Sequence, residues 1–244
     1  MKTLIKLLLL ALVAVYLVIA FTTMTGRDDN TVCREVSVTV ADSSRAGFIT
    51  AAEVERMLRA SGLYPIGRTM AQIDGASIER ELRRQSFIEN ATCYKAPGGT
   101  LNVLVEQRLP VLRVMAENGD DYYLDAKGCV MNPKGYVADL PVATGNVDRR
   151  FAQRQLLKLG LYLRDNAFWD NQIEQIHVTQ SHQIELYPRV GRQVILFGSA
   201  DSIPRKFQNL YTFYQKVMPE VGWNKYSTLS VEHVSQIVAK KTKS

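Results

Sequence analysis

Residues 88–105 read IENATCYKAPGGTLNVLV, and this stretch decides the fold of the first half of the chain. The segment from Ile88 to Tyr94 predicts a strand, and Pro97-Gly98-Gly99 predicts a tight turn. Apolar side chains then recur at every second position, the spacing of one face of a strand, at Leu101, Val103 and Val105. The stretch therefore predicts a β-hairpin.

Upstream of this hairpin the sequence predicts one strand and two helices. The strand is indicated by three valines in alternation with polar residues, Val36, Val38 and Val40. The first helix begins at a capping box, Thr50-Ala51-Ala52-Glu53, whose side chains satisfy otherwise unpaired N–H groups. The second helix begins at Asp74. Residues 34–106 thus follow the order strand, helix, helix, strand, strand, which predicts a compact α+β module.

Residues 107–244 predict a second domain, mainly antiparallel β with flanking helices. Asn118-Gly119 is a strong hairpin signal, because both residues accept the positive φ of a two-residue turn. Apolar residues at helical spacing predict a helix over residues 148–163 and another that starts at Ser202. Two closing strands are predicted at Tyr226–Val231 and Ser235–Lys240.

The amino-terminal region predicts a membrane anchor. We interpret residues 1–6 as a cytoplasmic tail, 7–24 as a single transmembrane helix and 25–33 as a linker. The apolar window Leu4–Met24 would be roughly 31 Å long as a helix, about the hydrocarbon thickness of a bilayer. Because Lys2 and Lys6 precede the apolar run, the positive-inside rule places the amino terminus in the cytoplasm and the remainder outside.

A cleaved signal peptide is the alternative interpretation of the same residues. The short basic segment and the apolar run fit one, and Val18-Ile19-Ala20 fits a cleavage site. Under both interpretations, the rest of the chain is exported from the cytoplasm.

The net charge argues against nucleic acid as a partner. The formal charge of +6 comes mostly from the two ends of the chain, at Lys2, Lys6, Lys240, Lys241 and Lys243. A nucleic-acid-binding domain needs its basic residues gathered on one folded face. The sequence therefore predicts no nucleic-acid partner.

No residue pattern indicates catalysis, a cofactor or a metal. The three histidines, His177, His182 and His233, have no acidic or cysteine partner at metal-ligand spacing. No Gly-x-Ser-x-Gly motif or phosphate-binding loop is present. We therefore expect no enzymatic activity, no cofactor and no small-molecule substrate.

The three cysteines permit one disulfide. Cys33 lies just before the first strand of the small module and Cys93 lies in its second, so we expect a Cys33–Cys93 bridge if their Cα atoms lie within about 4.4–6.8 Å of each other. Cys129 would then be a free thiol. The alternative is three unpaired cysteines that behave as small apolar side chains.

The whole arrangement resembles the FtsQ/DivIB family of bacterial cell-division proteins, in a Bacteroidetes-type form. The resemblance covers essentially the full chain, in the order tail, span, small module and β domain. It rests on Ile88-Glu89-Asn90-Ala91, on Glu106-Gln107-Arg108-Leu109-Pro110-Val111, on Tyr123-Leu124-Asp125-Ala126-Lys127-Gly128 and on Ile184-Glu185-Leu186-Tyr187-Pro188-Arg189-Val190-Gly191.

This resemblance implies a POTRA-like domain at residues 34–106 and an FtsQ-type β domain at 107–244. It also implies a non-enzymatic scaffold of the divisome in the inner membrane at the septum, with its domains in the periplasm. The implied partners are the FtsB/DivIC–FtsL pair, bound along an open edge strand that corresponds to Leu229–Lys240. The implied contact residues are Leu229, Val231, His233, Ser235, Gln236, Ile237, Val238 and Lys240.

Family members often carry an aromatic residue where this chain has His233, which leaves the side-chain part of that contact open. The alternatives to a divisome scaffold are an exported POTRA-type protein for polypeptide transport or envelope assembly, and a secreted wall-binding protein or hydrolase.

Overall fold

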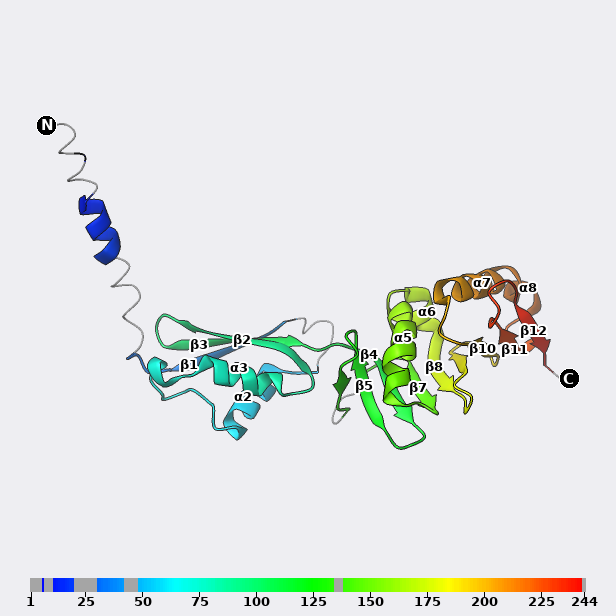
Figure 1. Ribbon diagram of the computed structural model, residues 1–244, viewed down its shortest axis with the longest axis horizontal. Helices are drawn as coiled ribbons and strands as arrows, with labels where there is room; N and C mark the ends of the chain where they lie inside the picture. Colours follow the sequence, from blue (N-terminus) through cyan, green and yellow to red (C-terminus); the bar gives the residue numbers. More distant parts are fainter. Residues whose placement is uncertain (1–5, 7–10, 20–29, 42–47, 134–137, 243–244) are drawn as a thin grey trace. The chain divides into compact units, whose positions relative to one another are not determined.

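The computed structural model describes residues 6, 11–19, 30–41, 48–133 and 138–242 (Figure 1). The chain forms two compact units, Met1–Gln107 and Arg108–Ser244. Residues 11–19 are helical. Within the described ranges, no helix is both long and apolar enough to cross a membrane. The rest of the predicted tail, span and linker lies outside these ranges, apart from Lys6 and residues 30–33.

In the first unit the predicted hairpin supplies two strands of a three-stranded sheet of order β1-β3-β2, in which β3 is the central strand. Strands β2 (Ile88–Ala96) and β3 (Thr100–Gln107) are antiparallel, and β1 (Glu35–Ala41) pairs with β3 in parallel. Helices α2 (Ala51–Ala60) and α3 (Gly75–Arg83) are joined by a loop with the short 3₁₀ helix η1 (Met70–Gln72).

The predicted start of α2 is confirmed. The Thr50 hydroxyl accepts a hydrogen bond from the Glu53 N–H at 3.3 Å, and the Thr50 N–H donates to the Glu53 carboxylate at 2.8 Å. The apolar faces of both helices are buried, as are the alternate residues of β3; these buried residues include Val54, Leu58, Ile78, Leu82, Leu101, Val103 and Val105. Local signals therefore predict this unit well.

The prediction of a Cys33–Cys93 disulfide is wrong. All three cysteines are free. Cys93 pairs with Val103 of β3, which pairs with Val38 of β1, so Cys93 and Val38 are two strand spacings apart, roughly 9–10 Å. Cys33 precedes β1 in the chain and is therefore displaced from Val38 along the strand direction as well. A bridge needs Cα atoms within about 7 Å. Burial raises the pKa of the Cys93 thiol to about 12, so this thiol is also a poor nucleophile.

The second unit is built on one nine-stranded sheet of order β12-β11-β10-β9-β8-β7-β4-β5-β6. Five neighbouring pairs of described strands are antiparallel and three are parallel, namely β4–β7, β7–β8 and β10–β11. The strands are β4 (Pro110–Ala116), β5 (Asp121–Asp125), β6 (Val130–Met131), β7 (Val142–Gly145), β8 (Ile173–Val178), β9 (Ile184–Pro188), β10 (Val194–Gly198), β11 (Tyr226–Ser230) and β12 (Val238–Lys241).

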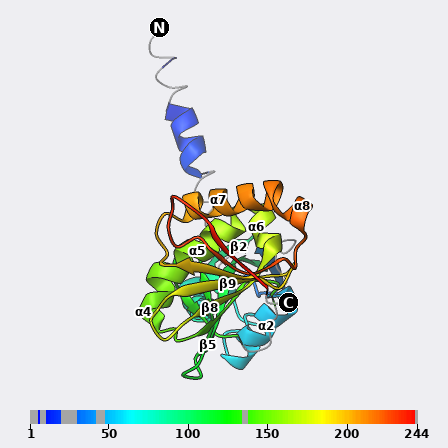
Figure 2. The same cartoon turned by 90° about the vertical axis from the view of Figure 1, so that its right-hand side faces the viewer.

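Helices cover one side of this sheet (Figure 2). The predicted helix over residues 148–163 is present as α4 (Arg149–Phe151), the π-helical turn η2 (Ala152–Leu156) and α5 (Leu157–Arg164). It is followed by α6 (Ala167–Gln172), α7 (Ile203–Lys216) and α8 (Met218–Val221). Leu156, Leu159 and Phe207 from these helices form one core with Ile176 and Leu186 of the sheet. Strand β7 and helix α6 were not predicted from the sequence.

Helix α7 is fastened to the end of β10 by a buried cation. The Lys206 ammonium group is 0% exposed and donates to the carbonyls of Phe197 at 3.1 Å and Ser199 at 2.8 Å. It also forms an ion pair with Asp201 at 2.9 Å. Three acceptors thus satisfy its three N–H groups, which is what allows a lysine to be buried.

Candidate protein-binding edge

Strand β12 is the outermost strand of the nine-stranded sheet. Its neighbour on one side is β11, and no described strand lies on its other side (Figure 1). An outermost strand presents unpaired N–H and C=O groups, which another extended chain can bind. β12 is therefore a candidate site for β-augmentation.

The direction of each N–H along β12 follows from its pairing with β11. The Thr242 N–H donates to the Lys225 carbonyl at 3.0 Å, just beyond the end of the ladder. Because donors alternate along an antiparallel strand, the N–H groups of Lys240 and Val238 also point toward β11. Those of Lys241 and Ala239 point outward. The register shift between Tyr226 and Thr228 adds its extra residue to β11, so the alternation along β12 is not interrupted.

The side chains of β12 also alternate between the two faces of the sheet. Ala239 is opposite Leu229 and packs against the core below the helices. Val238 and Lys240 project from the other face, and Val238 is 54% exposed. A strand added at this edge would thus lie beside an exposed valine and an exposed lysine on one face and beside a small, partly buried alanine on the other.

The edge carries positive charge. Lys225, Lys240 and Lys241 are exposed, and none of them forms an ion pair with another described residue. Unpaired surface cations attract acidic partners over about one Debye length, roughly 8 Å at physiological salt. The charge thus favours an acidic partner segment.

Three hydrogen bonds hold the β11–β12 hairpin in place. The Val231 N–H donates to the Leu196 carbonyl of β10 at 2.9 Å, and the Thr242 hydroxyl donates to the Asn224 carbonyl at 3.0 Å. The Asn209 amide of α7 donates to the Val234 carbonyl at 2.9 Å, which fastens the connection between the two strands to the helix. The edge is therefore a supported part of the sheet.

The predicted contact residues divide into three groups. Leu229 and Val231 are 0% and 1% exposed and support the hairpin from the core. His233, Ser235 and Gln236 lie in the exposed connection between β11 and β12, and Ile237 is half-buried. Only Val238 and Lys240 lie on the edge strand itself.

The predicted strand Ser235–Lys240 therefore begins too early. The Gln236 N–H donates back to the His233 carbonyl at 3.3 Å, which makes this segment a turn, and β12 runs from Val238 to Lys241. The outward donors Ala239 and Lys241 were missed, because sequence alternation does not indicate which N–H groups face a neighbouring strand.

The histidines have ordinary structural neighbours. The His177 ring Nδ1 lies 3.2 Å from the Thr144 hydroxyl, and the His182 ring lies 3.9 Å from the Asp148 carboxylate. In the described ranges, no group of three or more His, Cys, Asp or Glu residues could hold a metal ion.

Comparison with known proteins gives two family matches and one relative. Residues 109–240 match the family model described as FtsQ/DivIB, C-terminal related, and residues 31–106 match that of the POTRA-like domain. The cell division protein FtsQ of Rhodothermus marinus is 27% identical to this chain over 197 residues, which cover 75% of this chain and 71% of that protein.

Proposed function

Since the chain belongs to the FtsQ/DivIB family of cell-division proteins, we propose that it is a non-enzymatic membrane scaffold of the divisome. In this proposal it holds the FtsB/DivIC–FtsL pair at the septum by accepting a strand of the FtsB/DivIC-type partner at β12. The observation that carries the proposal is the open edge of β12, with outward N–H groups at Ala239 and Lys241.

Backbone hydrogen bonds at this edge can form with many partner sequences, because they do not depend on side-chain identity. Each added ladder bond contributes about 1 kcal/mol net, so a few bonds supply affinity while side chains on both faces supply specificity. The exposed Val238 favours an apolar residue beside it, and the lysines favour acidic residues. The proposal thus predicts an extended, acidic and partly apolar segment in the partner.

We propose further that the chain is anchored in the inner membrane by residues 7–24, with both folded units in the periplasm. The support is the apolar window Leu4–Met24 together with the preceding lysines. Edman sequencing of the protein from membrane fractions tests this part. An intact amino terminus agrees with an anchor, whereas a mature terminus at Phe21 contradicts it.

Affinity capture tests the scaffold role. The tagged full-length protein is captured from detergent-solubilised membranes, and the co-purified proteins are identified by mass spectrometry. We expect FtsB/DivIC-type and FtsL-type proteins in amounts comparable to the bait. Recovery of outer-membrane assembly or translocation components in their place would favour a transport or envelope-assembly role and contradict the proposal.

A further inference from the structure

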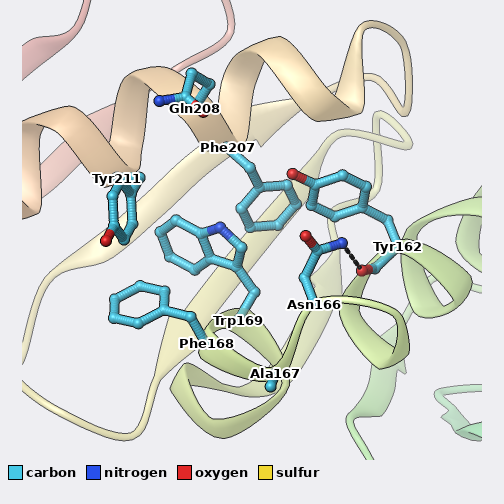
Figure 3. A pocket seen from close by; sticks show the side chains of 8 residues that line it. All are labelled: Tyr162, Asn166, Ala167, Phe168, Trp169, Phe207, Gln208 and Tyr211. Atoms are coloured by element: carbon cyan, nitrogen blue, oxygen red, sulfur yellow. Dashed lines mark hydrogen bonds between the residues drawn. The ribbon is translucent and has the colours of Figure 1, made fainter.

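A pocket of about 320 Å³ lies on the helical side of the second unit, and none of its lining residues belongs to β12. It is formed by the end of α5, the beginning of α6 and one face of α7 (Figure 3). Its lining residues are Tyr162, Asn166, Ala167, Phe168, Trp169, Phe207, Gln208 and Tyr211. This volume is at the lower end of the range for ligand sites.

Five of the eight lining residues are aromatic, and four of them form a floor and a rim. Trp169 and Phe207 form the floor, with 4% and 0% exposure and ring centroids 4.7 Å apart. Phe168 and Tyr211 form the rim, with 39% and 38% exposure, and pack edge to face at 5.1 Å. Aromatic side chains at the mouth of a pocket are typical of ligand sites.

The polar groups of the pocket are uncharged hydrogen-bonding groups. The Asn166 amide donates to the Tyr162 carbonyl at 2.6 Å, which fixes its orientation (Figure 3). The Gln208 amide and the Tyr211 hydroxyl have no hydrogen-bond partner among the described residues and remain available as donors. No Asp, Glu, Lys, Arg or His lines the pocket, so it complements an uncharged ligand.

We propose that this pocket binds an uncharged, proline-containing segment of a partner protein in the extended polyproline conformation. The faces of the aromatic rings offer strong packing but no good acceptor for a peptide N–H, so an N–H turned toward these rings would be left unpaired. Proline has no N–H, and its ring packs on aromatic faces. The peptide carbonyls beside it can accept hydrogen bonds from Gln208 and Tyr211.

Two further arguments favour this ligand over a saccharide. A polyproline segment is already extended in solution, so little conformational entropy is lost on binding to an aromatic-lined groove. A sugar ring instead buries several hydroxyl groups, each of which costs free energy unless it finds a partner. The proposal is independent of the role of β12, because the pocket and the outward N–H groups share no residue.

Titration calorimetry with the purified full-length protein tests this inference. The probe is acetyl-octaproline amide, and the comparison ligands are a glycine–serine peptide of equal length and the tetramer of N-acetylglucosamine. We expect saturable binding of octaproline only. The variants Tyr211→Ala and Phe168→Ala should each weaken it at least tenfold, which is about 1.4 kcal/mol.

Gln208→Ala provides a second test that does not disturb the aromatic packing, because this side chain is exposed. Loss of one hydrogen bond should weaken octaproline binding about fivefold. Tyr94→Ala is the matched control, since Tyr94 is a 57% exposed aromatic in the other unit, and it should leave binding unchanged. Absence of saturable octaproline binding would overturn the proposal. So would equal weakening by the control, or binding of the saccharide that the pocket variants abolish.

Discussion

Proline substitution at two neighbouring residues of β12 should separate partner binding from stability. The Lys241 N–H points outward and the Lys240 N–H points toward β11, so proline removes a different hydrogen bond at each position. Lys241→Pro should abolish a bond to the guest strand and leave the β11–β12 ladder intact. Lys240→Pro should break the ladder itself.

The magnitudes follow from these bonds. A lost guest bond of about 1 kcal/mol, together with the proline ring in the path of the guest carbonyl, should weaken partner binding at least tenfold. The unfolding free energy of Lys241→Pro should change by no more than about 0.5 kcal/mol. Lys240→Pro should cost about 3 kcal/mol locally. The global loss is smaller if β12 detaches while the rest of the sheet stays folded.

The assay pairs surface plasmon resonance against a purified FtsB/DivIC-type partner with urea unfolding of each full-length variant. Trp169 and Trp223 both lie in the unit Arg108–Ser244, so tryptophan fluorescence reports the unfolding of this unit. Lys241→Ala and Lys240→Ala are the matched controls, because they remove the same charges and keep the N–H groups. Equal affinity of Lys241→Pro and Lys241→Ala would refute the reasoning.

Four other substitutions test the fold, three of them in the second unit and one in the first. Lys206→Met should destabilise the second unit by about 2 kcal/mol in urea unfolding, because the carbonyls of Phe197 and Ser199 lose their hydrogen bonds from the ammonium group. The variant also avoids the dehydration of a buried ammonium group, which offsets part of the loss. An unchanged unfolding midpoint would contradict this. Gly145→Ala should cost at least about 3 kcal/mol in the same assay, since a Cβ there would lie 2.1 Å from the Val178 carbonyl oxygen at φ +89°. Gly119→Ala, at φ +88° with open space, should cost only about 1–2 kcal/mol. Thr50→Ala should cost about 1 kcal/mol through loss of the cap, measured as faster hydrogen exchange of the α2 amides, and unchanged exchange would contradict it.

The pH dependence of the Lys206 substitution has a definite sign. The hydrogen bond from Ser199, followed by that from Lys206, lowers the pKa of Asp201. A lowered pKa contributes stability above the unfolded value of about 3.9, and this stability is lost as the pH falls through the lower folded value. The difference between wild type and Lys206→Met should therefore shrink below about pH 4. The effect is small, because the Asp201 side chain is 66% exposed.

Local sequence signals predicted the first unit because its helices and strands begin or end at recognisable motifs. The capping box at Thr50 and the glycine turn before β3 are interactions between near neighbours in sequence, and both are present in the structure. The disulfide prediction failed because it depended on which strands are neighbours. The parallel pairing of β1 with β3 separates Cys33 from Cys93, and no local pattern encodes that order.

In the second unit the missed elements are short. Strand β7 has four residues and lies between two parallel neighbours, so it shows too little alternation to be recognised. Helix α6 has six residues, too few to show the helical spacing of apolar side chains. Its Trp169 is buried, but Phe168 is exposed beside Tyr211 of α7, a contact between distant parts of the sequence. Sequence patterns report on residues that are near neighbours in the chain, so they could not predict a pocket between α6 and α7.

Amide hydrogen exchange along β12 tests the central claim most directly. In the free full-length protein, the amides of Val238 and Lys240 should exchange slowly, because they donate to β11, and those of Ala239 and Lys241 should exchange fast. Saturation with the FtsB/DivIC-type partner should slow exchange at Ala239 and Lys241 at least tenfold. Unchanged fast exchange at both outward amides in the saturated complex would contradict β-augmentation at this edge.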